Sequence, residues 1–528
     1  MKSSLTNRIR SYFKENSSYV SVIILTLATF MSVLDSTVVN VSLPKMSDDL
    51  STTPTEIIWV VTSYIVAMAA VLPISGWLAT YFGRKRYYLA SVIGFTAASV
   101  MCAFSTSLEM LVFSRIIQGL SAGGIAPSEQ AIIADITPKE KLGRTFAIYS
   151  LGISVAPILG PTLGGFITDT LSWHWIFLIN LPLGIISIVL TYVFVKESDT
   201  AEKMTKEFRT GDNTVDWLGV FFFVSGIATL ELVLMEGPRE NWLESDFVLI
   251  MAIYCAFALL SGIVWEYYRR KPAVDVRMFK DRTFSTACIL ILTVSLVISG
   301  SSFLTPFFTQ VLLGYSAMDA GMLGLPATIA QMAIIPIVGY FSDKIDVRKI
   351  IFIGLAFTAF AVLNFLSFNL QSEYNDIMLA RMFYTGSLGF LAATVNTVAY
   401  YHISAAQNNS ASALLNLVRN VGASLGIALT STIITVKSQV HINDASYHTN
   451  PYNPNFTQAI ANLSDAIVTN GLDTANAADR ALGVMWQEIL RQSTMNAVLD
   501  AVAVYVILHL CLIPLVFLLK GKTKDNLV

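Results

Sequence analysis

Charged residues are scarce in this sequence. Asp, Glu, Lys and Arg make up 13% of its 528 residues, whereas a soluble domain has about 25%. Hydrophobic residues make up 54%, and the mean hydropathy is +0.62. These values exclude a soluble enzyme on a single membrane anchor, and they predict an all-α integral membrane protein that crosses the bilayer many times.

The motifs of several enzyme classes are also missing. No Gly-rich phosphate loop ends in Gly-Lys-Ser or Gly-Lys-Thr, so we do not expect ATP to power this protein directly. No His, Cys and Asp residues have metal-site spacing, and no Ser, His and Asp are placed for nucleophilic catalysis. We therefore expect no enzyme, no metal and no cofactor, and an ion gradient as the energy source.

Cysteine is rare, and all four cysteines lie in apolar segments. This predicts reduced, packed thiols and no disulfide framework. A cleavable signal is not visible either, because residues 1–18 are polar and basic and the apolar run that follows is too long for a signal peptide. We expect that run to remain as the first span. The cysteines are Cys102, Cys255, Cys288 and Cys511.

Fourteen segments are long and apolar enough to span a membrane, which takes about 20 residues. With an inside N-terminus, 26 of the 34 Lys and Arg residues fall in cytoplasmic segments and 5 in outer loops. This bias predicts that both termini are cytoplasmic. The segments are about 19–43, 57–79, 87–106, 109–133, 145–168, 174–195, 215–236, 246–266, 284–308, 320–341, 350–369, 376–400, 412–436 and 496–519.

Two parts of the chain repeat each other. The basic turn after Gly76 recurs after Gly339, 263 residues later, and Arg115 recurs as Arg381, 266 residues later. We predict two six-helix halves with a substrate site at their interface near the membrane midplane. Their expected limits are 1–200 for the N-terminal half, 201–270 for an inserted helix pair (spans 7 and 8), and 271–528 for the C-terminal half, with an outer loop at 437–495.

An acidic residue, Asp35, interrupts the first span, where a carboxylate costs about 2.5–3.5 kcal/mol on insertion scales. It lies about 12 Å from the outer end of its span, and Arg115 lies about 9 Å from the outer end of the fourth span. Their similar depth predicts an ion pair, since pairing lowers the cost of both charges. The pair is either a proton-coupling site, in which Asp35 binds the proton and Arg115 promotes its release, or a structural pair that never titrates.

A second acid, Glu129, follows Arg115 by fourteen residues and falls within about 40° of the same helical face. It is either a second proton-coupling group or an interfacial carboxylate in water. Candidate residues of the substrate cavity are Trp59, Tyr64, Gln118, Asn416 and Arg419.

Candidate gating and packing residues lie in the two basic turns and in the fifth span. Glycines let helix backbones approach closely, and prolines bend the helix. The basic turn either only anchors the topology or also binds helix C-termini at an inward gate. These candidates are Gly76, Gly83, Arg84, Lys85, Gly160, Pro161, Gly164, Gly165 and Asp343.

Taken in order along the chain, these motifs resemble the major facilitator superfamily. The inserted pair resembles that of its fourteen-span drug:proton antiporters, of the EmrB-like multidrug exporter type. One departure is Thr80, where the family often has an acid, and Asp343 fills the corresponding place in the second half. The motifs are Leu34-Asp35-Ser36-Thr37-Val38-Val39-Asn40-Val41-Ser42-Leu43-Pro44, Gly76 to Arg86, Arg115-Ile116-Ile117-Gln118-Gly119, Gly152 to Gly165, Trp173 to Gly184, and Gly237 to Trp242.

The resemblance implies alternating access in the inner membrane of a bacterium, with export of amphipathic, hydrophobic or cationic compounds in exchange for protons. Export of one metabolite, such as a siderophore or fatty acid, is an alternative, and a non-transporting sensor on a transporter scaffold is another. The expected partners are a small amphipathic substrate, protons and membrane lipid, without nucleic acid.

The polar 437–495 segment is either a dock for a periplasmic adaptor protein of the membrane-fusion type or a solvated loop. Apolar residues from Ala478 to Ile489 share one helical face, which predicts that a helix precedes the last span.

Overall fold

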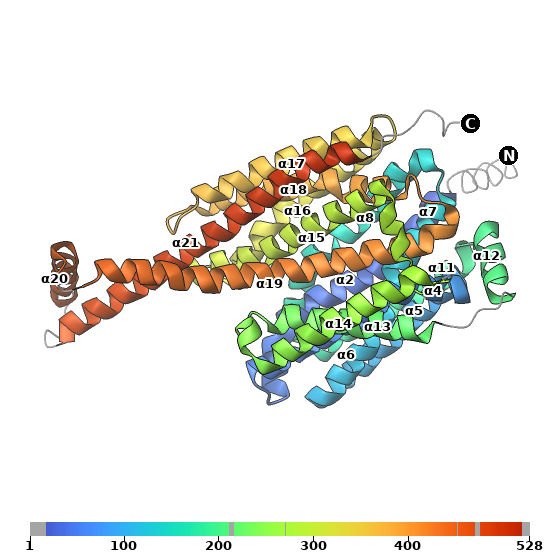
Figure 1. The fold of residues 1–528 in the computed structure, drawn as a ribbon. Helices are drawn as coiled ribbons and strands as arrows, with labels where there is room; N and C mark the ends of the chain where they lie inside the picture. The colour runs from blue at the N-terminus through green and yellow to red at the C-terminus, as the bar shows by residue number, and fades with distance from the viewer. Residues whose placement is uncertain (1–16, 211–215, 270, 451, 470–475, 520–528) are drawn as a thin grey trace, which may run out of the picture.

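The computed structural model describes residues 17–210, 216–269, 271–450, 452–469 and 476–519, which form α-helices joined mostly by short turns (Figure 1). The all-α membrane fold expected from the composition is thereby confirmed. Its first helices are α2 (Ser17–Asp49), α3 (Pro54–Ile57), α4 (Trp59–Phe82), α5 (Arg84–Ala103), α6 (Leu108–Ala122), α7 (Ile125–Ile136), α8 (Leu142–Ser154), α9 (Ala156–Thr170), α10 (His174–Leu178) and α11 (Asn180–Phe194).

The remaining helices begin with a short surface helix and two spans, and they end with two very long helices. They are α12 (Asp199–Thr210), α13 (Trp217–Glu236), α14 (Asp246–Tyr268), α15 (Arg282–Pro306), α16 (Ala317–Ser342), α17 (Val347–Asn364), α18 (Tyr374–Tyr400), α19 (Asn408–His448), α20 (Pro454–Thr469) and α21 (Ala477–Leu515).

In the described part of the chain, twelve helical segments are long and apolar enough to cross a membrane. The predicted count of fourteen is therefore not fully confirmed. The predicted span 87–106 corresponds to α5, of which only 17 residues follow its three basic residues. The predicted span 109–133 is split at Gly123 and Gly124 into α6 and α7, with 15 and 12 residues. Both regions still pack among the spanning helices, α6 on α4 and α5, and α7 on α2 and α19.

The helices form two groups that meet along a shared interface. Within the first group α2 packs on α9 and α4 on α6, and within the second α15 packs on α19 and α16 on α18. Between the groups, α4 and α7 pack on α19, while α8 packs on α16 and α18. The proposed boundaries at residues 200 and 270 fall in the first turn of α12 and just after α14.

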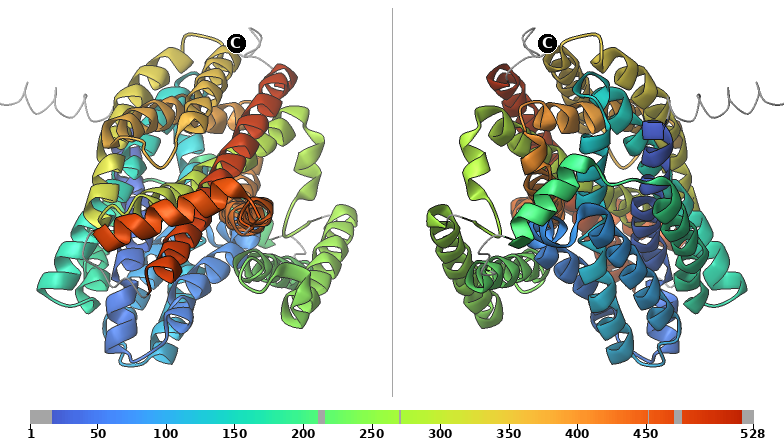
Figure 2. Two further views of the ribbon diagram at one scale, coloured as in Figure 1. Left: turned by 90° about the vertical axis from the view of Figure 1, so that its left-hand side faces the viewer. Right: turned by 90° about the vertical axis from the view of Figure 1, so that its right-hand side faces the viewer.

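The inserted pair, α13 and α14, lies at the edge of the bundle (green in Figure 2). Helix α13 contacts α14, and it also contacts α4 of the first group and α19 of the second. It therefore lies beside the line along which the two groups meet.

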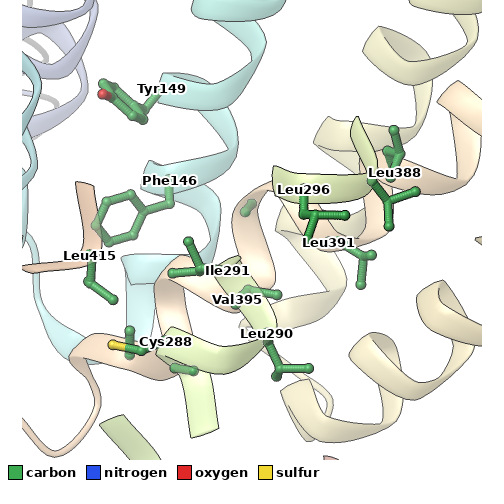
Figure 3. Close-up of a cluster of buried hydrophobic side chains, with 14 of the residues drawn as sticks. Phe146, Tyr149, Cys288, Leu290, Ile291, Leu296, Leu388, Leu391, Val395 and Leu415 are labelled. Carbon is green, nitrogen blue, oxygen red and sulfur yellow. The ribbon is translucent and has the colours of Figure 1, made fainter. Parts of the chain in front are cut away.

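A buried apolar cluster holds the two groups together (Figure 3). Phe146 and Tyr149 come from α8, whereas Ile291 comes from α15 and Leu391 from α18. Phe146 also stacks on Tyr400 of α18, with ring centroids 5.4 Å apart. In a membrane such contacts stabilise through close packing and dispersion, since lipid is as apolar as the side chains.

The predicted outer loop at 437–495 is largely helical. At 1.5 Å per residue, the 41 residues of α19 extend over about 62 Å, roughly twice the ~30 Å apolar core of a bilayer. Helices α19 and α21 run past the bundle to α20, at the end opposite α12 (Figure 1). The helix predicted before the last span is confirmed, because α21 begins at Ala477 and buries Ala481.

Candidate functional site

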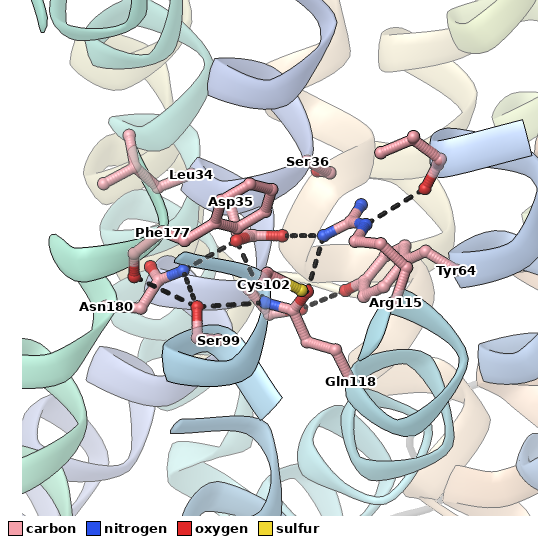
Figure 4. A network of polar contacts seen from close by, with 12 residues as sticks. Leu34, Asp35, Ser36, Tyr64, Ser99, Cys102, Arg115, Gln118, Phe177 and Asn180 are labelled. Atoms are coloured by element: carbon pink, nitrogen blue, oxygen red, sulfur yellow. Dashed lines mark hydrogen bonds and ion pairs between the residues drawn. The ribbon is translucent and has the colours of Figure 1, made fainter. Parts of the chain in front are cut away.

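A buried carboxylate on α2 is the centre of the site (Figure 4). The Asp35 side chain accepts a hydrogen bond at Oδ2 from Arg115 Nη1 of α6, at 2.6 Å. At Oδ1 it accepts from Gln118 Nε2 at 3.0 Å and from Asn180 Nδ2 at 2.6 Å. All four side chains are buried. The negative charge is therefore matched by one cation and two amide donors, as a buried ion pair requires.

A second shell of contacts fixes the amides. The Ser99 hydroxyl of α5 accepts from Asn180 Nδ2 at 2.8 Å and from Gln118 Nε2 at 3.2 Å. It donates to the carbonyl of Phe177 at 3.1 Å. Asn180 stands in the first turn of α11, so Ser99 links three helices to the carboxylate.

Arg115 has partners besides the carboxylate. Its Nε donates to the carbonyl of Val60 at 3.0 Å, and its Nη1 also donates to Gln118 Oε1 at 2.7 Å. The guanidinium carbon lies 4.2 Å from the ring centroid of Tyr64, in a cation–π contact. Arg115 and Gln118 reach the same carboxylate because residues three apart share a helix face.

The structure thus brings together Asp35 and Arg115, whose similar depth predicted a pair. The sequence also pointed to Gln118, but as a cavity residue. Ser99 and Asn180 were missed as partners, although Asn180 lies within the motif from Trp173 to Gly184. A buried amide at the start of a span was the available signal for Asn180, while a single serine in a span carries none.

Glu129 lies in a separate buried cluster on α7. It accepts hydrogen bonds from the backbone N–H of Thr29 at 3.2 Å, from the Thr29 hydroxyl, and from the Tyr88 hydroxyl at 3.4 Å. Its complete burial contradicts the alternative of an interfacial carboxylate in water. The helix break at Gly123 and Gly124 also means that no continuous helix carries Arg115 and Glu129.

A cavity of about 500 Å³ lies between the two helix groups. Thr29 and Tyr149 line it from the first group, and Asn396, Asn416 and Arg419 from the second. Arg419 donates to Asn416 Oδ1 at 2.8 Å and to Asn396 Oδ1 at 2.7 Å. Two of the predicted cavity residues, Asn416 and Arg419, therefore lie where a substrate could enter.

The other predicted cavity residues lie elsewhere. Tyr64 and Gln118 turn toward Arg115 and Asp35 and are not among the residues that line this cavity. Trp59 is 40% exposed at the start of α4 and does not line it either. Residue type alone predicted these three, and the helix faces on which they lie decide otherwise.

At the cytoplasmic end, Arg84 ties the two helix groups together. It is buried, forms an ion pair with Asp135 of α7, and donates to the carbonyl of Ala405 at 2.8 Å. Asn408 of α19 donates to the same carboxylate, with 2.7 Å between Nδ2 and Oδ1. Lys139 donates to the carbonyl of Tyr401 at 3.0 Å. The turn between α18 and α19 is therefore held by charges of the first group.

Helices α4 and α19 approach each other closely beside this turn. A Cβ on Gly76 would lie 2.7 Å from the carbonyl oxygen of Asn409, so only glycine fits without a shift. Thr80, which stands where the family often has an acid, accepts a hydrogen bond from Asn409 Nδ2 at 2.8 Å. A neutral hydrogen bond thus takes the place of a salt bridge there.

The second basic turn contributes a further link between the groups. Asp343 at the end of α16 accepts from the backbone N–H of Arg144 at 3.3 Å, and its Oδ2 lies 3.9 Å from Arg144 Nε. Of the other gating candidates, Lys85 donates to the carbonyl of Tyr192 at 2.9 Å. Gly83 has a positive φ of 93°, which ends α4.

The glycines of the predicted fifth span differ in role. A Cβ on Gly160 would clash with Thr37, and one on Gly164 would lie 3.1 Å from the carbonyl of Val38, so both permit close packing of α9 on α2. A Cβ on Gly165 would meet nothing within 4 Å, which contradicts a packing role. The side chain of Pro161 lies outside the described residues.

Spanning helices in two groups, a cavity between them and a charged pair buried beside it define a polytopic membrane transporter. Comparison with known proteins agrees, since residues 25–427 match the family model of the Major Facilitator Superfamily. The chain belongs to the major facilitator superfamily. It is a secondary transporter and not an enzyme.

Individual relatives cover most of the chain. The multidrug export protein EmrB of Haemophilus influenzae is 33% identical over 433 residues, 81% of this chain and 83% of that protein. The fatty acid resistance protein FarB of Neisseria gonorrhoeae is 30% identical over 497 residues, 94% of each chain. The structure of the human organic anion transporter MFSD10 shares the fold, with a TM-score of 0.57, 12% identity, and coverage of 94% of this chain and 98% of that one.

We expect Asn180→Ala to lower the thermal stability of the detergent-solubilised protein, because Asp35 loses a charge-assisted hydrogen bond worth about 1.5–3 kcal/mol. Asn364→Ala is the matched control, since that exposed amide bonds only to the Phe360 carbonyl of its own helix. Thermal unfolding of both variants measures the effect. Equal melting temperatures for the two variants would contradict a stabilising role for Asn180.

We expect Gly76→Ala to open the cytoplasmic end, because its Cβ would press on the backbone of Asn409. The reporter is the thiol that Ser412→Cys introduces in a background without the four native cysteines, since Ser412 is buried one turn from this contact. In inside-out vesicles a membrane-impermeant maleimide should label it faster in Gly76→Ala than in the parent. Gly165→Ala should leave labelling unchanged, and equal rates for Gly76→Ala and Gly165→Ala would refute a gating role for Gly76.

Proposed function

We propose that this protein exports amphipathic, hydrophobic or cationic compounds in exchange for protons, by alternating access, across the inner membrane of a bacterium. The observation that carries this proposal is the buried Asp35–Arg115 pair beside a cavity that lies between two helix groups. A titratable pair inside a spanning bundle is costly, and proton coupling gives that cost a purpose. The EmrB relatives, whose names describe multidrug export, support the same reading.

Proton binding at Asp35 provides the coupling step. Protonation removes the negative charge that faces Arg115, and a buried charge that loses its partner is destabilised by about 3–5 kcal/mol. A differential free energy of about 5.5 kcal/mol moves a two-state equilibrium from 1:99 to 99:1. Protonation of this one group is therefore large enough to bias the packing of α2 against α6, and with it the state of the transporter.

Glu129 is proposed as a second proton-binding group. In the described residues its side-chain partners are neutral hydroxyls of Thr29 and Tyr88. Thr29 also lines the central cavity, so Glu129 lies one side chain away from the substrate space. This arrangement gives a proton a site on the cavity wall that is independent of Arg115.

We expect Asp35→Asn to abolish gradient-driven transport while the protein still inserts and binds substrate, because Asn has the same shape but no titratable charge. Uptake of ethidium into inside-out vesicles under an imposed pH gradient measures transport, and equilibrium binding of ethidium measures the site. The matched control is Asp465→Asn, an exposed acid on α20. Normal pH-driven uptake by Asp35→Asn would refute the proton site.

Export of one metabolite, such as a fatty acid, is the second candidate, and the similarity to FarB over 94% of both chains favours it. The two candidates differ in selectivity. A multidrug exporter in these vesicles should have its ethidium uptake inhibited by structurally unrelated amphiphiles, whereas a dedicated exporter should not transport ethidium.

We also propose that the projecting helices dock a periplasmic adaptor protein of the membrane-fusion type. Helices α19 and α21 leave the bundle as a pair and carry exposed aromatic side chains near α20. Tyr447 is 79% exposed, Tyr452 is 95% exposed, and Trp486 is also exposed. Contiguous apolar surface in an aqueous compartment marks an interaction site.

We expect the combined Tyr447→Ser, Tyr452→Ser and Trp486→Ser variant to lose efflux from whole cells but to keep transport in proteoliposomes, where no adaptor is present. Tyr268→Ser is the matched control, because Tyr268 is 82% exposed at the opposite end of the molecule. Loss of both activities in the combined variant would count against docking.

A further inference from the structure

Arg381 on α18 is a cation inside the membrane bundle without a counter-charge. In the part of the chain that the structure describes, it forms no ion pair, and its buried Nε has no hydrogen-bond partner. It lies seven residues from the start of α18, so about 10 Å along the helix. A guanidinium at such depth is costly when isolated. The missing partner is therefore to be sought outside the chain.

The internal repeat identifies what is missing. Arg381 follows Arg115 by 266 residues, and the same offset leads from Asp35 to Ser301 and from Gln118 to Tyr384. Ser301 and Tyr384 line one cavity together with Arg381. The second half thus keeps the arginine of the first half but has a neutral hydroxyl in place of the carboxylate.

The packing of glycines supports this offset. In the first half, Gly152 of α8 has no room for a side chain because Thr26 of α2 lies against it. In the second half, Gly422 of α19 meets Leu292 of α15 in the same way. Leu292 follows Thr26 by 266 residues, so α15 is in register with α2 at the level where Ser301 corresponds to Asp35.

The cavity around Arg381 has the walls of a site for an amphiphile. Its volume is about 330 Å³, at the lower end of the roughly 300–1,000 Å³ typical of ligand pockets. Hydroxyls of Ser301, Thr305 and Thr328 lie among its lining residues. Apolar side chains form most of the remaining wall, among them Phe308, Phe368, Met495, Val498 and Val502.

This cavity adjoins the central one, and the joint space is positively charged. Five residues line both: Ile153, Ser154, Ile298, Gln331 and Leu388.

Among the described residues that line either cavity there is no Asp or Glu, whereas Arg381 and Arg419 are both present. Two acids lie behind the wall. Glu129 is bonded to Thr29, and Glu231 of α13 accepts from Asn420 Nδ2 at 3.1 Å. The charge that faces the space is thus cationic.

We propose that the cavity around Arg381 binds the carboxylate of an anionic amphiphile, with its alkyl or aryl body against the apolar wall. The ligand carboxylate takes the place beside Arg381 that Asp35 has beside Arg115. An arginine fork binds a carboxylate through two parallel charge-assisted hydrogen bonds. The inference rests on the proposed function, for which it names a substrate class, but binding requires no gradient.

Binding is measured on the purified full-length protein in phosphatidylcholine nanodiscs, which carry no anionic lipid. Dodecanoate and dodecyltrimethylammonium are the two probes, because they share one alkyl chain and differ in the sign of the head group. We expect Arg381→Gln to weaken dodecanoate binding roughly tenfold to a hundredfold, as for the loss of a hydrogen bond to a charged group. The binding of dodecyltrimethylammonium should not weaken, and Arg381→Lys should retain part of the dodecanoate affinity.

Ser301 provides a second test that does not remove the arginine. Ser301→Asp should supply an internal carboxylate to Arg381 and abolish dodecanoate binding, whereas the neutral variant Ser301→Asn should retain it. Equal dodecanoate binding by Ser301→Asp and Ser301→Asn would overturn the proposal. It would also be overturned if Arg381→Gln bound dodecanoate like the wild type, or lost both probes equally.

The same protein separates this inference from the proposed function. Ethidium uptake that depends on a pH gradient, together with dodecanoate binding that ignores Arg381, would sink the anion site alone. Charge-selective dodecanoate binding without any gradient-driven uptake of ethidium would leave the site standing and overturn proton-coupled export.

Discussion

The membrane makes every unbalanced charge expensive, and this constraint organises the bundle around Asp35. A carboxylate at this depth is tolerated because Arg115, Gln118 and Asn180 converge on it from two other helices. Each of those residues is itself bonded to a neighbour, so α2, α5, α6 and α11 meet in one polar network (Figure 4). The arrangement of these helices and the charge state of one side chain therefore depend on each other. A change of a single proton acts on the packing of half the bundle.

The two halves solve the same problem differently. The first half carries a paired arginine, a closed network and a buried acid, while the second carries Arg381 and Arg419 with neutral or no partners. The repeat therefore preserved the cations and lost the acid. An asymmetric charge distribution of this kind separates two tasks, since the balanced half can respond to protons and the unbalanced half can receive a ligand of opposite charge.

Much of the fold could be predicted because hydropathy and the Lys and Arg bias act over whole segments. The Asp35–Arg115 contact was also predictable, since depth in the membrane is a one-dimensional quantity that residue counting gives. Ser99 and Asn180 could not be found as partners, because the face on which two helices meet is set by packing. Gly165 was misjudged for the same reason: glycine spacing shows that close approach is possible, and only the neighbours show where it occurs. The polar 437–495 segment was predicted as a loop, yet a helix satisfies its own backbone in water as well as in lipid.

The length of α19 has a mechanical consequence. One uninterrupted helix carries Arg419 in the cavity wall and Tyr447 at its outer end. Twenty-eight residues separate them, which is about 42 Å at 1.5 Å per residue. At that radius each degree of tilt displaces the outer end by roughly 0.7 Å. The helix is a lever arm, so any rocking of the second group during a cycle is transmitted, amplified, to whatever is held at its tip.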